Sequence, residues 1–152
     1  MYGEYHPNPT VRLHGIAQEG GRDTVGLGAA VFAEVLATAF LVFCVFALTD
    51  GRNRQRPGVQ LAPFFIGATV AVLVAVVGPV TQACLNPARD FGPRIFAAIA
   101  GWGEVAFPGP RGAFDTLAVY LAAPIVGAIL GGFVYQRLLG SSQSTVADKE
   151  EA

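Results

Sequence analysis

Three long apolar stretches alternate with short polar segments along the chain. They cover residues 25–48, 61–85 and 117–139, and the charged side chains within them are Glu34 and Arg137. A membrane-spanning helix needs about 20 apolar residues to cross a hydrocarbon core roughly 30 Å thick. Each stretch is therefore long enough to span a bilayer. The alternative, a very apolar soluble core, is disfavoured because segments this long rarely lie fully inside a small domain.

The composition supports the same interpretation. Hydrophobic residues make up 53% of the 152-residue chain, charged residues make up 14%, and the mean hydropathy is +0.49. These values exceed what a solvated surface can carry, so we expect an all-α, multi-pass integral protein of the cell membrane. A net charge of −1 without a basic run excludes nucleic acid as a partner. The spacing of Cys44 and Cys84 suits neither a metal site nor a disulfide framework, and no cofactor is expected.

The polar segments set the expected boundaries and orientation. Arg52, Arg54 and Arg56 crowd the link between the first two stretches, which marks this link as cytoplasmic because basic residues concentrate on the inner side. We expect one membrane unit over residues 24–140, with a polar extracellular lead before it and a disordered cytoplasmic tail after it. The lead covers residues 1–23, the tail covers 141–152, and the spans lie at about 25–48, 61–82 and 117–139. The lead lacks the pattern of a signal peptide, so the first span is expected to drive insertion.

Small residues recur four positions apart in each expected span. Such rows let helix backbones approach closely in lipid, where packing rather than the hydrophobic effect drives association. They predict that each helix has a protein neighbour along its length, unless alanine and glycine are simply frequent in this chain. The rows are Ala29, Ala33 and Ala37, then Gly67, Ala71 and Ala75, then Ala123, Gly127 and Gly131.

Glu34 lies near the middle of the first expected span. A charged side chain there costs roughly 3 kcal/mol on insertion scales and is usually satisfied by protein partners. We therefore expect Glu34 to face inward. A proton relay would need further acidic or histidine side chains in the spans, and the sequence places none in these stretches, so a structural role is favoured over a relay.

The segment after the second span predicts a short helix at membrane depth. Asn86 is a favoured N-cap residue, Pro87 suits the first helical position, and the helical pattern continues to about residue 98 before Gly101 and Gly103 end it. About eleven residues at 1.5 Å each give about 17 Å, which is half a bilayer. A half-length helix beside full spans implies a re-entrant element. Irregular backbone at this depth is tolerated only where it is buried or lines a wet cavity, so the segment points to a solute pathway.

Three charged residues follow the start of this half-helix. Arg89 lies in the first turn, where the helix dipole disfavours a cation, so stability alone does not explain it. Asp90 and Arg94 are four positions apart with the acid first, a spacing that suits a supporting ion pair. By itself the Asn-Pro-Ala sequence that ends at Ala88 also fits an ordinary turn and helix cap.

Taken together, residues 86–94 resemble the second signature loop of the major intrinsic proteins, the family of aquaporins and glycerol facilitators. Residues 5–9, 100–107 and 124–128 resemble other segments of glycerol facilitators, so the likeness extends from about Tyr5 to Gly140. The resemblance implies one inverted repeat of the aquaporin fold, with three transmembrane helices and one re-entrant half-helix. It also implies a passive channel for small neutral solutes, glycerol or water, rather than an enzyme.

The resemblance assigns roles to individual residues. Asn86 would donate hydrogen bonds to the passing solute, Arg89 would form the positive wall of a narrow filter, and Glu34 would brace the loop. Pro87, Ala88, Asp90 and Arg94 would support the half-helix, and the last two resemble the glycerol-conducting branch. Solute-accepting main-chain carbonyls would come from the unwound stretch Gln82, Ala83, Cys84 and Leu85.

The sequence departs from glycerol channels at three aligned positions. Ala83 stands at a filter position that is often Phe, and Val74 stands at one that is a small Gly. These two changes exchange bulk from one side of the filter to the other. The sequence therefore does not determine the width of the pore. Tyr120 replaces a frequent Pro near the start of the last span and is closer to water channels.

Channels of this family contain two inverted repeats, whereas this chain carries one Asn-Pro-Ala sequence. We therefore expect either a fragment of a longer product or half of an assembly, with a first-repeat half or an antiparallel homodimer as partner and a higher oligomer as in the family. A non-conducting membrane fragment or subunit is the alternative. An enzyme is disfavoured because the spans and loops hold no nucleophile–base pair, metal cluster or phosphate loop.

Overall fold

The apolar stretches and the segment between the last two of them form helices. The computed structural model describes residues 25–107 and 113–140. In order, the main helices are α1 (Leu27–Thr49), α2 (Ala62–Thr81), α3 (Pro87–Ala97), α4 (Ala113–Leu117) and α5 (Ala123–Tyr135). Within these two ranges, three helical segments are long and apolar enough to cross a membrane. The chain is therefore an all-α, multi-pass membrane protein, while the expected lead (1–23) and tail (141–152) lie outside the described residues.

The third span begins earlier than the apolar pattern predicts. It runs over residues 113–139 as one helical segment, in which the wider turns of η4 (Ala118–Ala122) join α4 to α5. The apolar pattern placed the start at Leu117, two residues after Asp115. Asp115 and Thr116 are buried at 1% and 0% exposure and both make polar interactions, so the first turn lies inside the protein despite its polarity.

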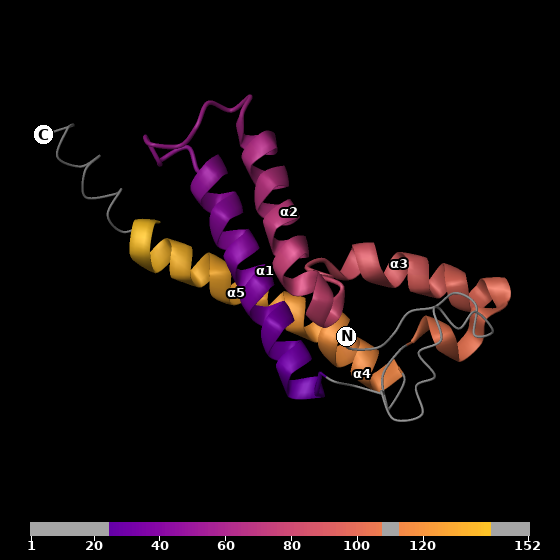
Figure 1. Cartoon of the computed structure of the whole chain (residues 1–152). Helices are drawn as coiled ribbons and strands as arrows, with labels where there is room; N and C mark the ends of the chain where they lie inside the picture. The colour runs from indigo at the N-terminus through magenta and orange to yellow at the C-terminus, as the bar shows by residue number, and fades with distance from the viewer. Residues whose placement is uncertain (1–24, 108–112, 141–152) are drawn as a thin grey trace, which may run out of the picture.

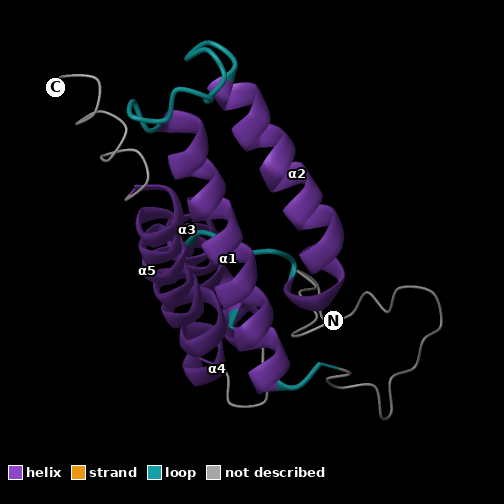
Figure 2. Cartoon of the chain, turned by 90° about the vertical axis from the view of Figure 1, so that its left-hand side faces the viewer, coloured by secondary structure: helices purple, strands orange, loops and turns teal. Residues whose placement is uncertain are grey.

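Helix α1 lies between α2 and α5, and α3 projects to one side of this group (Figure 1). The view turned by 90° shows the same order, with the link between α1 and α2 at one end of the bundle (Figure 2). The long helix α1 contacts both other spans, with the more extensive contact along α5. It is therefore the central element onto which the loop before α3 is attached.

Close backbone approach explains the contact between α1 and α5. A Cβ atom added at Gly127 would collide with the carbonyl oxygen of Val35, and one added at Gly131 would collide with that of Ala39. Further along, the ring of Tyr135 packs against Phe43 and Phe46, with ring centroids 5.8 Å and 5.6 Å away. The small-residue row of the third span therefore meets a helix neighbour, as predicted.

The row on the second span has no such neighbour in the described part of the chain. Gly67, Ala71 and Ala75 are exposed, and a Cβ added at Gly67 would meet nothing within 4 Å. Ala37 of the first row is buried, whereas Ala29 at the beginning of α1 is exposed. The small-residue row thus meets a neighbour on α5 and in part on α1, whereas α2 packs against α1 through other residues and its own row stays uncovered within the described residues.

Polar side chains close the end of α1 at the link. Asn53 Nδ2 and Arg56 Nη1 donate to the carbonyl oxygens of Ala47 and Thr49, at 2.8 Å and 3.0 Å, and so satisfy groups that the helix end leaves open. Tyr135 donates its hydroxyl to Asp50 at 2.9 Å, which ties the link to α5. Hydrogen bonds from Arg52 hold the pKa of Asp50 below its ordinary value.

Candidate functional site

The candidate site is built on an irregular loop that joins α2 to α3. Helix α2 ends because its C-cap Gln82 adopts a left-handed backbone, with φ of 68°. Ala83 and Leu85 also have positive φ, at 51° and 55°. L-residues rarely adopt this conformation, which costs of order 1 kcal/mol or more each and persists only where the surroundings enforce it.

Glu34 supplies much of that enforcement from the middle of α1. Its Oε1 accepts hydrogen bonds from Thr81 Oγ1 at 2.5 Å and from the amide of Cys84 at 2.9 Å, and its Oε2 accepts one from the amide of Leu85 at 2.9 Å. Glu34 is fully buried. Its carboxyl group therefore has protein partners on both oxygens, which is how an acidic group can be kept inside a membrane helix.

The backbone amides of residues 82–86 all donate within the protein. Gln82 donates to the carbonyl oxygen of Gly78 at 2.9 Å, Ala83 donates to Thr81 Oγ1 at 3.3 Å, and Asn86 donates to the carbonyl of Cys84 at 2.6 Å. The amides between them donate to Glu34. Because consecutive amides of the loop point into the protein, most of its carbonyl oxygens are left to accept hydrogen bonds from other donors.

Asn86 begins α3 as a cap residue. Its backbone is extended, and its Oδ1 accepts hydrogen bonds from the amides of Ala88 at 3.0 Å and Arg89 at 3.4 Å. Pro87 occupies the first helical position, where a missing amide proton costs nothing. Because Oδ1 is used by the cap, the exposed side chain of Asn86 keeps its Nδ2 as a donor toward its surroundings.

Arg89 reaches back over the loop. Its Nη1 donates to the carbonyl oxygens of Ala83 at 3.0 Å and Cys84 at 3.4 Å. A carbonyl oxygen has two lone pairs, so that of Ala83 retains capacity for a further hydrogen bond, whereas that of Cys84 also accepts from the amide of Asn86. The arrangement places a permanent positive charge beside the positive end of the α3 dipole, and the side chain of Arg89 is exposed.

Asp90 and Arg94 fasten α3 to the segment that follows it. Two nitrogen atoms of Arg94 bond the carboxylate of Asp90, and Nη1 donates to the carbonyl oxygen of Ala106 at 3.0 Å. The guanidinium also lies over the ring of Tyr120, 4.6 Å from the centroid. The pair is therefore a structural clamp between α3, the segment 103–106 and the last span.

Two contacts in this region were not predicted from the sequence. Thr81 contacts Glu34 as described, and Cys84 Sγ donates to the carbonyl oxygen of Tyr120 at 3.5 Å. Pro124 lies four residues after Tyr120 and lacks the amide that would bond this carbonyl in an α-helix. The proline at this spacing was the signal that could have indicated an unpaired carbonyl in the last span.

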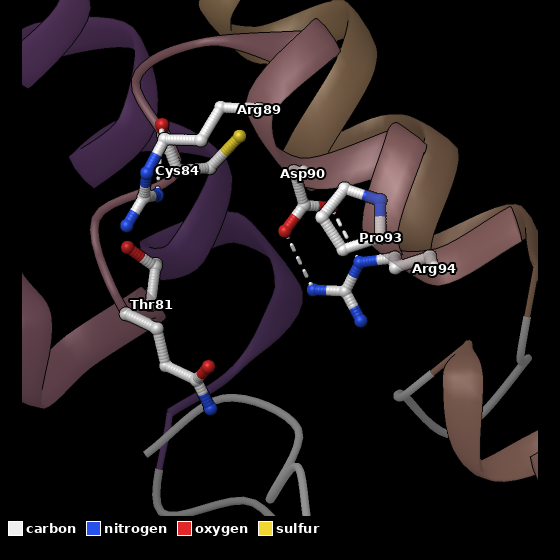
Figure 3. Close-up of a pocket in the computed structure, with 7 residues that line it drawn as sticks. Thr81, Cys84, Arg89, Asp90, Pro93 and Arg94 are labelled. Atoms are coloured by element: carbon white, nitrogen blue, oxygen red, sulfur yellow. Dashed lines mark hydrogen bonds and ion pairs between the residues drawn. The ribbon is translucent and has the colours of Figure 1, made fainter. Parts of the chain in front are cut away.

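A pocket of about 390 Å³ lies between the loop and the outer side of α3 (Figure 3). Thr81, Cys84 and Arg89 line it on the loop side, and Asp90 and Arg94 line it on the helix side. Its walls therefore carry hydroxyl, carboxylate and guanidinium groups close together. Such a lining suits a small polar solute better than an apolar one.

The expected pore residues fall into two groups. Asn86, Arg89 and Val74 are exposed, and Gln82 lines the pocket. The other three, Ala83, Cys84 and Leu85, are buried at 1%, 2% and 7% exposure, with Ala83 and Leu85 packed against Ala37, Leu73 and Val77. The side chain of Ala83 thus faces the helices in this structure.

Residues 25–107 and 113–140 contain no group of three or more metal-ligating side chains. Histidine, cysteine, aspartate and glutamate are the side chains that most often bind metal ions in proteins. The arrangement at the loop is one of hydrogen-bond donors and acceptors around a fixed cation.

Comparison of the sequence with known proteins identifies one family and several of its members as similar to this chain. The family model described as "Major intrinsic protein" matches residues 6–135. The glycerol uptake facilitator protein of Shigella flexneri is 49% identical over 111 residues, which cover 73% of this chain and 39% of that protein. The propanediol uptake facilitator PduF of Citrobacter freundii is 45% identical over 113 residues, or 74% of this chain and 41% of that protein.

A third relative matches a longer part of the chain. The glycerol uptake facilitator protein of Pseudomonas aeruginosa is 41% identical over 128 residues, which cover 84% of this chain and 45% of that protein. The chain therefore spans less than half the length of each of these relatives.

Proposed function

The chain belongs to the major intrinsic protein family, and from this premise we propose that it supplies one half of a transmembrane channel for small neutral solutes such as glycerol and water. The observation that carries the proposal is the loop at residues 82–86. Its amides donate inward, to Glu34 among others, while Asn86 Nδ2 and the guanidinium of Arg89 are exposed beside its carbonyls. A polar, hydrogen-bonding surface at membrane depth is stable only where water or solute reaches it.

A solute that carries hydroxyl groups needs both donors and acceptors along its path. Asn86 Nδ2 and Arg89 supply donors, and the carbonyl groups of Gln82, Ala83, Cys84 and Leu85 supply acceptors. A glycerol hydroxyl can use both kinds at once, so the loop replaces part of the hydration that the solute loses. Val74, 41% exposed on α2, would form part of the opposite wall.

The same geometry disfavours cations. Helix α3 directs the positive end of its dipole toward the loop, and Arg89 adds a full positive charge there. Neutral solutes avoid this repulsion because they carry no net charge. We therefore propose selectivity against cations and protons together with permeability to neutral polyols or water.

We propose that α3 is the re-entrant half-helix of one inverted repeat. Its eleven residues, at 1.5 Å each, extend about 17 Å, which is half the thickness of the hydrocarbon core. A pore built from such half-helices needs a second one from the other side. The complementary half would come from the remainder of a longer polypeptide, from a separate first-repeat chain, or from an antiparallel copy of this chain. The exposed row Gly67, Ala71 and Ala75 on α2 is the close-packing surface that such a half would cover.

Vesicle swelling tests the proposal directly. The full chain would be reconstituted alone and together with the part of the Shigella flexneri relative that lies outside the matched region, and glycerol and water entry would be measured. We expect permeability above that of empty vesicles in at least one arrangement. The same swelling rates in both arrangements and in empty vesicles would instead support the alternative, a non-conducting membrane fragment or subunit.

Asn86→Asp provides a matched variant. Aspartate keeps the oxygen that caps α3 and loses the Nδ2 donor, so the helix should remain while solute contact is impaired. We expect unchanged helix content and at least a tenfold lower glycerol permeability, the change that about 1.4 kcal/mol produces. Full glycerol permeability in Asn86→Asp would show that Asn86 does not contact the passing solute.

A further inference from the structure

A second pocket, of about 440 Å³, lies between α1 and α2, away from the loop at residues 82–86. Phe40, Cys44 and Leu48 of α1 line it together with Phe65, Ala68 and Val72 of α2. We call this surface the apolar groove. From Phe40 to Leu48 it follows eight helical steps, about 12 Å at 1.5 Å per residue.

The walls of the apolar groove offer few groups for a polar ligand to bond, namely the hydroxyl oxygen of Thr69 and the thiol of Cys44. Thr69 also lines the groove, but its hydroxyl donates to the carbonyl oxygen of Phe65 on its own helix, at 2.9 Å. The remaining lining is aliphatic, aromatic or a thiol. An occupant must therefore be apolar along this length.

The end of the groove has the opposite character. Residues 50–61 join α1 to α2 at one end of the bundle (Figure 2), and the lining residues Leu48 and Phe65 lie within a few positions of this link in the sequence. This link holds Arg52, Arg54 and Arg56 against a single acid, Asp50, whose charge Arg52 neutralises through a two-atom salt bridge. The link thus carries two positive charges in excess.

The link joins the ends of two helices that are long and apolar enough to span a membrane, so we expect it at the height of the membrane surface. Val59 and Leu61 near its end are 71% and 55% exposed. Apolar side chains this close to basic residues fit the boundary between lipid tails and head groups, where arginine side chains reach toward phosphate.

We propose that the apolar groove and the arginines of the link form a binding site for one anionic phospholipid, with an acyl chain between α1 and α2 and the head-group phosphate at the link. A second copy of this chain fits less well. In a parallel copy the arginines of two links would meet, and like charges repel. The site does not depend on whether the chain conducts solutes.

Lipid retention by the purified full chain tests the proposal. The protein in a neutral detergent would be mixed with dioleoylphosphatidylglycerol or with dioleoylphosphatidylcholine, which share acyl chains and differ in head-group charge. Native mass spectrometry would then count the retained lipid. We expect the anionic lipid to bind more tightly by about fivefold for each engaged arginine.

Paired variants separate the head-group site from the groove. Arg54→Gln should weaken retention of the anionic lipid about fivefold, and Arg54→Lys should restore it because the charge returns. Arg137→Gln removes the same charge from a residue that lies over Phe133 at the end of the third span, and should change nothing. Ala68→Phe should fill the groove and abolish retention, whereas Ala71→Phe, on the same helix outside the groove, should not.

Several results would overturn the proposal. Equal retention of the two lipids would show that the arginines do not bind the head group. Undiminished retention by a folded Ala68→Phe variant would show that the acyl chain does not occupy the groove. A dimer that forms without lipid and is lost in Ala68→Phe would show that a second copy occupies the groove.

Discussion

Glu34 and Leu85 are 51 positions apart in the sequence, yet the amide of Leu85 donates to Glu34 Oε2 at 2.9 Å. This bond fixes the last strained residue of the loop to the centre of α1. Leu85 has φ of 55°, and the next residue is the cap of α3. The start of the half-length helix is therefore held to the spans by this buried carboxyl group, in addition to the clamp formed by Asp90 and Arg94.

Replacing this carboxyl group should damage folding first. Glu34→Leu leaves two buried amides and the hydroxyl of Thr81 without an acceptor, and each unsatisfied group costs about 1–3 kcal/mol. We expect destabilisation of about 3 kcal/mol or more, measured by thermal unfolding in detergent and by the amount of protein that reaches the membrane. Glu34→Gln, which keeps one acceptor oxygen, should fall between the wild type and Glu34→Leu. Normal accumulation of the leucine variant with an unchanged melting temperature would contradict this role.

The sequence predicts much of this arrangement because its signals are local. Span lengths follow from apolar runs, and the start of α3 follows from Asn86 and Pro87. The expected half-helix at about 87–98 compares with Pro87–Ala97. Gly101 and Gly103 take positive φ, 99° and 54°, at the place where the sequence ends the helix.

Long-range contacts were predicted less well. The bond from Cys84 to the carbonyl of Tyr120 and the buried polar start of the third span both depend on which helices meet in space. In the sequence, a charged residue such as Asp115 indicates the end of an apolar span. In the structure, Asp115 is part of the helix because it is buried with interaction partners. The buried side chain of Ala83 has the same origin, since the left-handed loop decides which way it points.

Close packing between α1 and α5 should be sensitive to a single methyl group. Gly127→Ala and Gly131→Ala each place a Cβ against a backbone carbonyl, which cannot move aside as a flexible side chain can. We expect each to lower the free energy of unfolding by about 1–3 kcal/mol. Gly67→Ala is the matched control, because a Cβ there meets nothing within 4 Å and alanine favours a helix. Equal melting temperatures for all three variants would show that the helices do not pack in this way.

A buried hydroxyl on α1 offers a stabilising change. Thr38 Oγ1 is buried and has no hydrogen-bond partner among the residues that the structure describes. Thr38→Val keeps the shape and removes the unpaired group, so we expect stabilisation of about 1 kcal/mol or more. Thr69→Val, which removes an exposed and paired hydroxyl, should stay within about 0.5 kcal/mol of the wild type. A lower melting temperature for Thr38→Val would indicate that the hydroxyl has a partner.

Arg89 should govern selectivity within a complete pore. Arg89→Ala removes the cation beside α3 and one donor from each of the carbonyl oxygens of Ala83 and Cys84, so the passage becomes wider and more negative. We expect the permeability ratios among glycerol, urea and water to converge, as measured by vesicle swelling. Arg137→Ala, which removes a charge lying over Phe133, should leave the ratios unchanged. Wild-type ratios in Arg89→Ala would exclude it from the filter.

Charge bias bears on whether the isolated chain can pair with itself. Positive charge near the ends of spans sets orientation, and a weak bias allows both orientations in one membrane. Five basic residues lie on the expected cytoplasmic side and three on the other, a small difference. The first set is Arg52, Arg54, Arg56, Arg137 and Lys149, and the second is Arg12, Arg22 and Arg111.

If the chain conducts without another protein, we expect it to do so as an antiparallel pair. Such a homodimer brings two Asn86 side chains and the starts of two α3 helices face to face, which recreates the symmetry of two inverted repeats. C-terminal tags should then be accessible from both faces of the membrane, in comparable amounts, in vesicles that admit glycerol. Glycerol entry into vesicles with every tag on one face would exclude the antiparallel pair. A separate first-repeat chain would then be the partner, because a single half-helix reaches only to the middle of the bilayer.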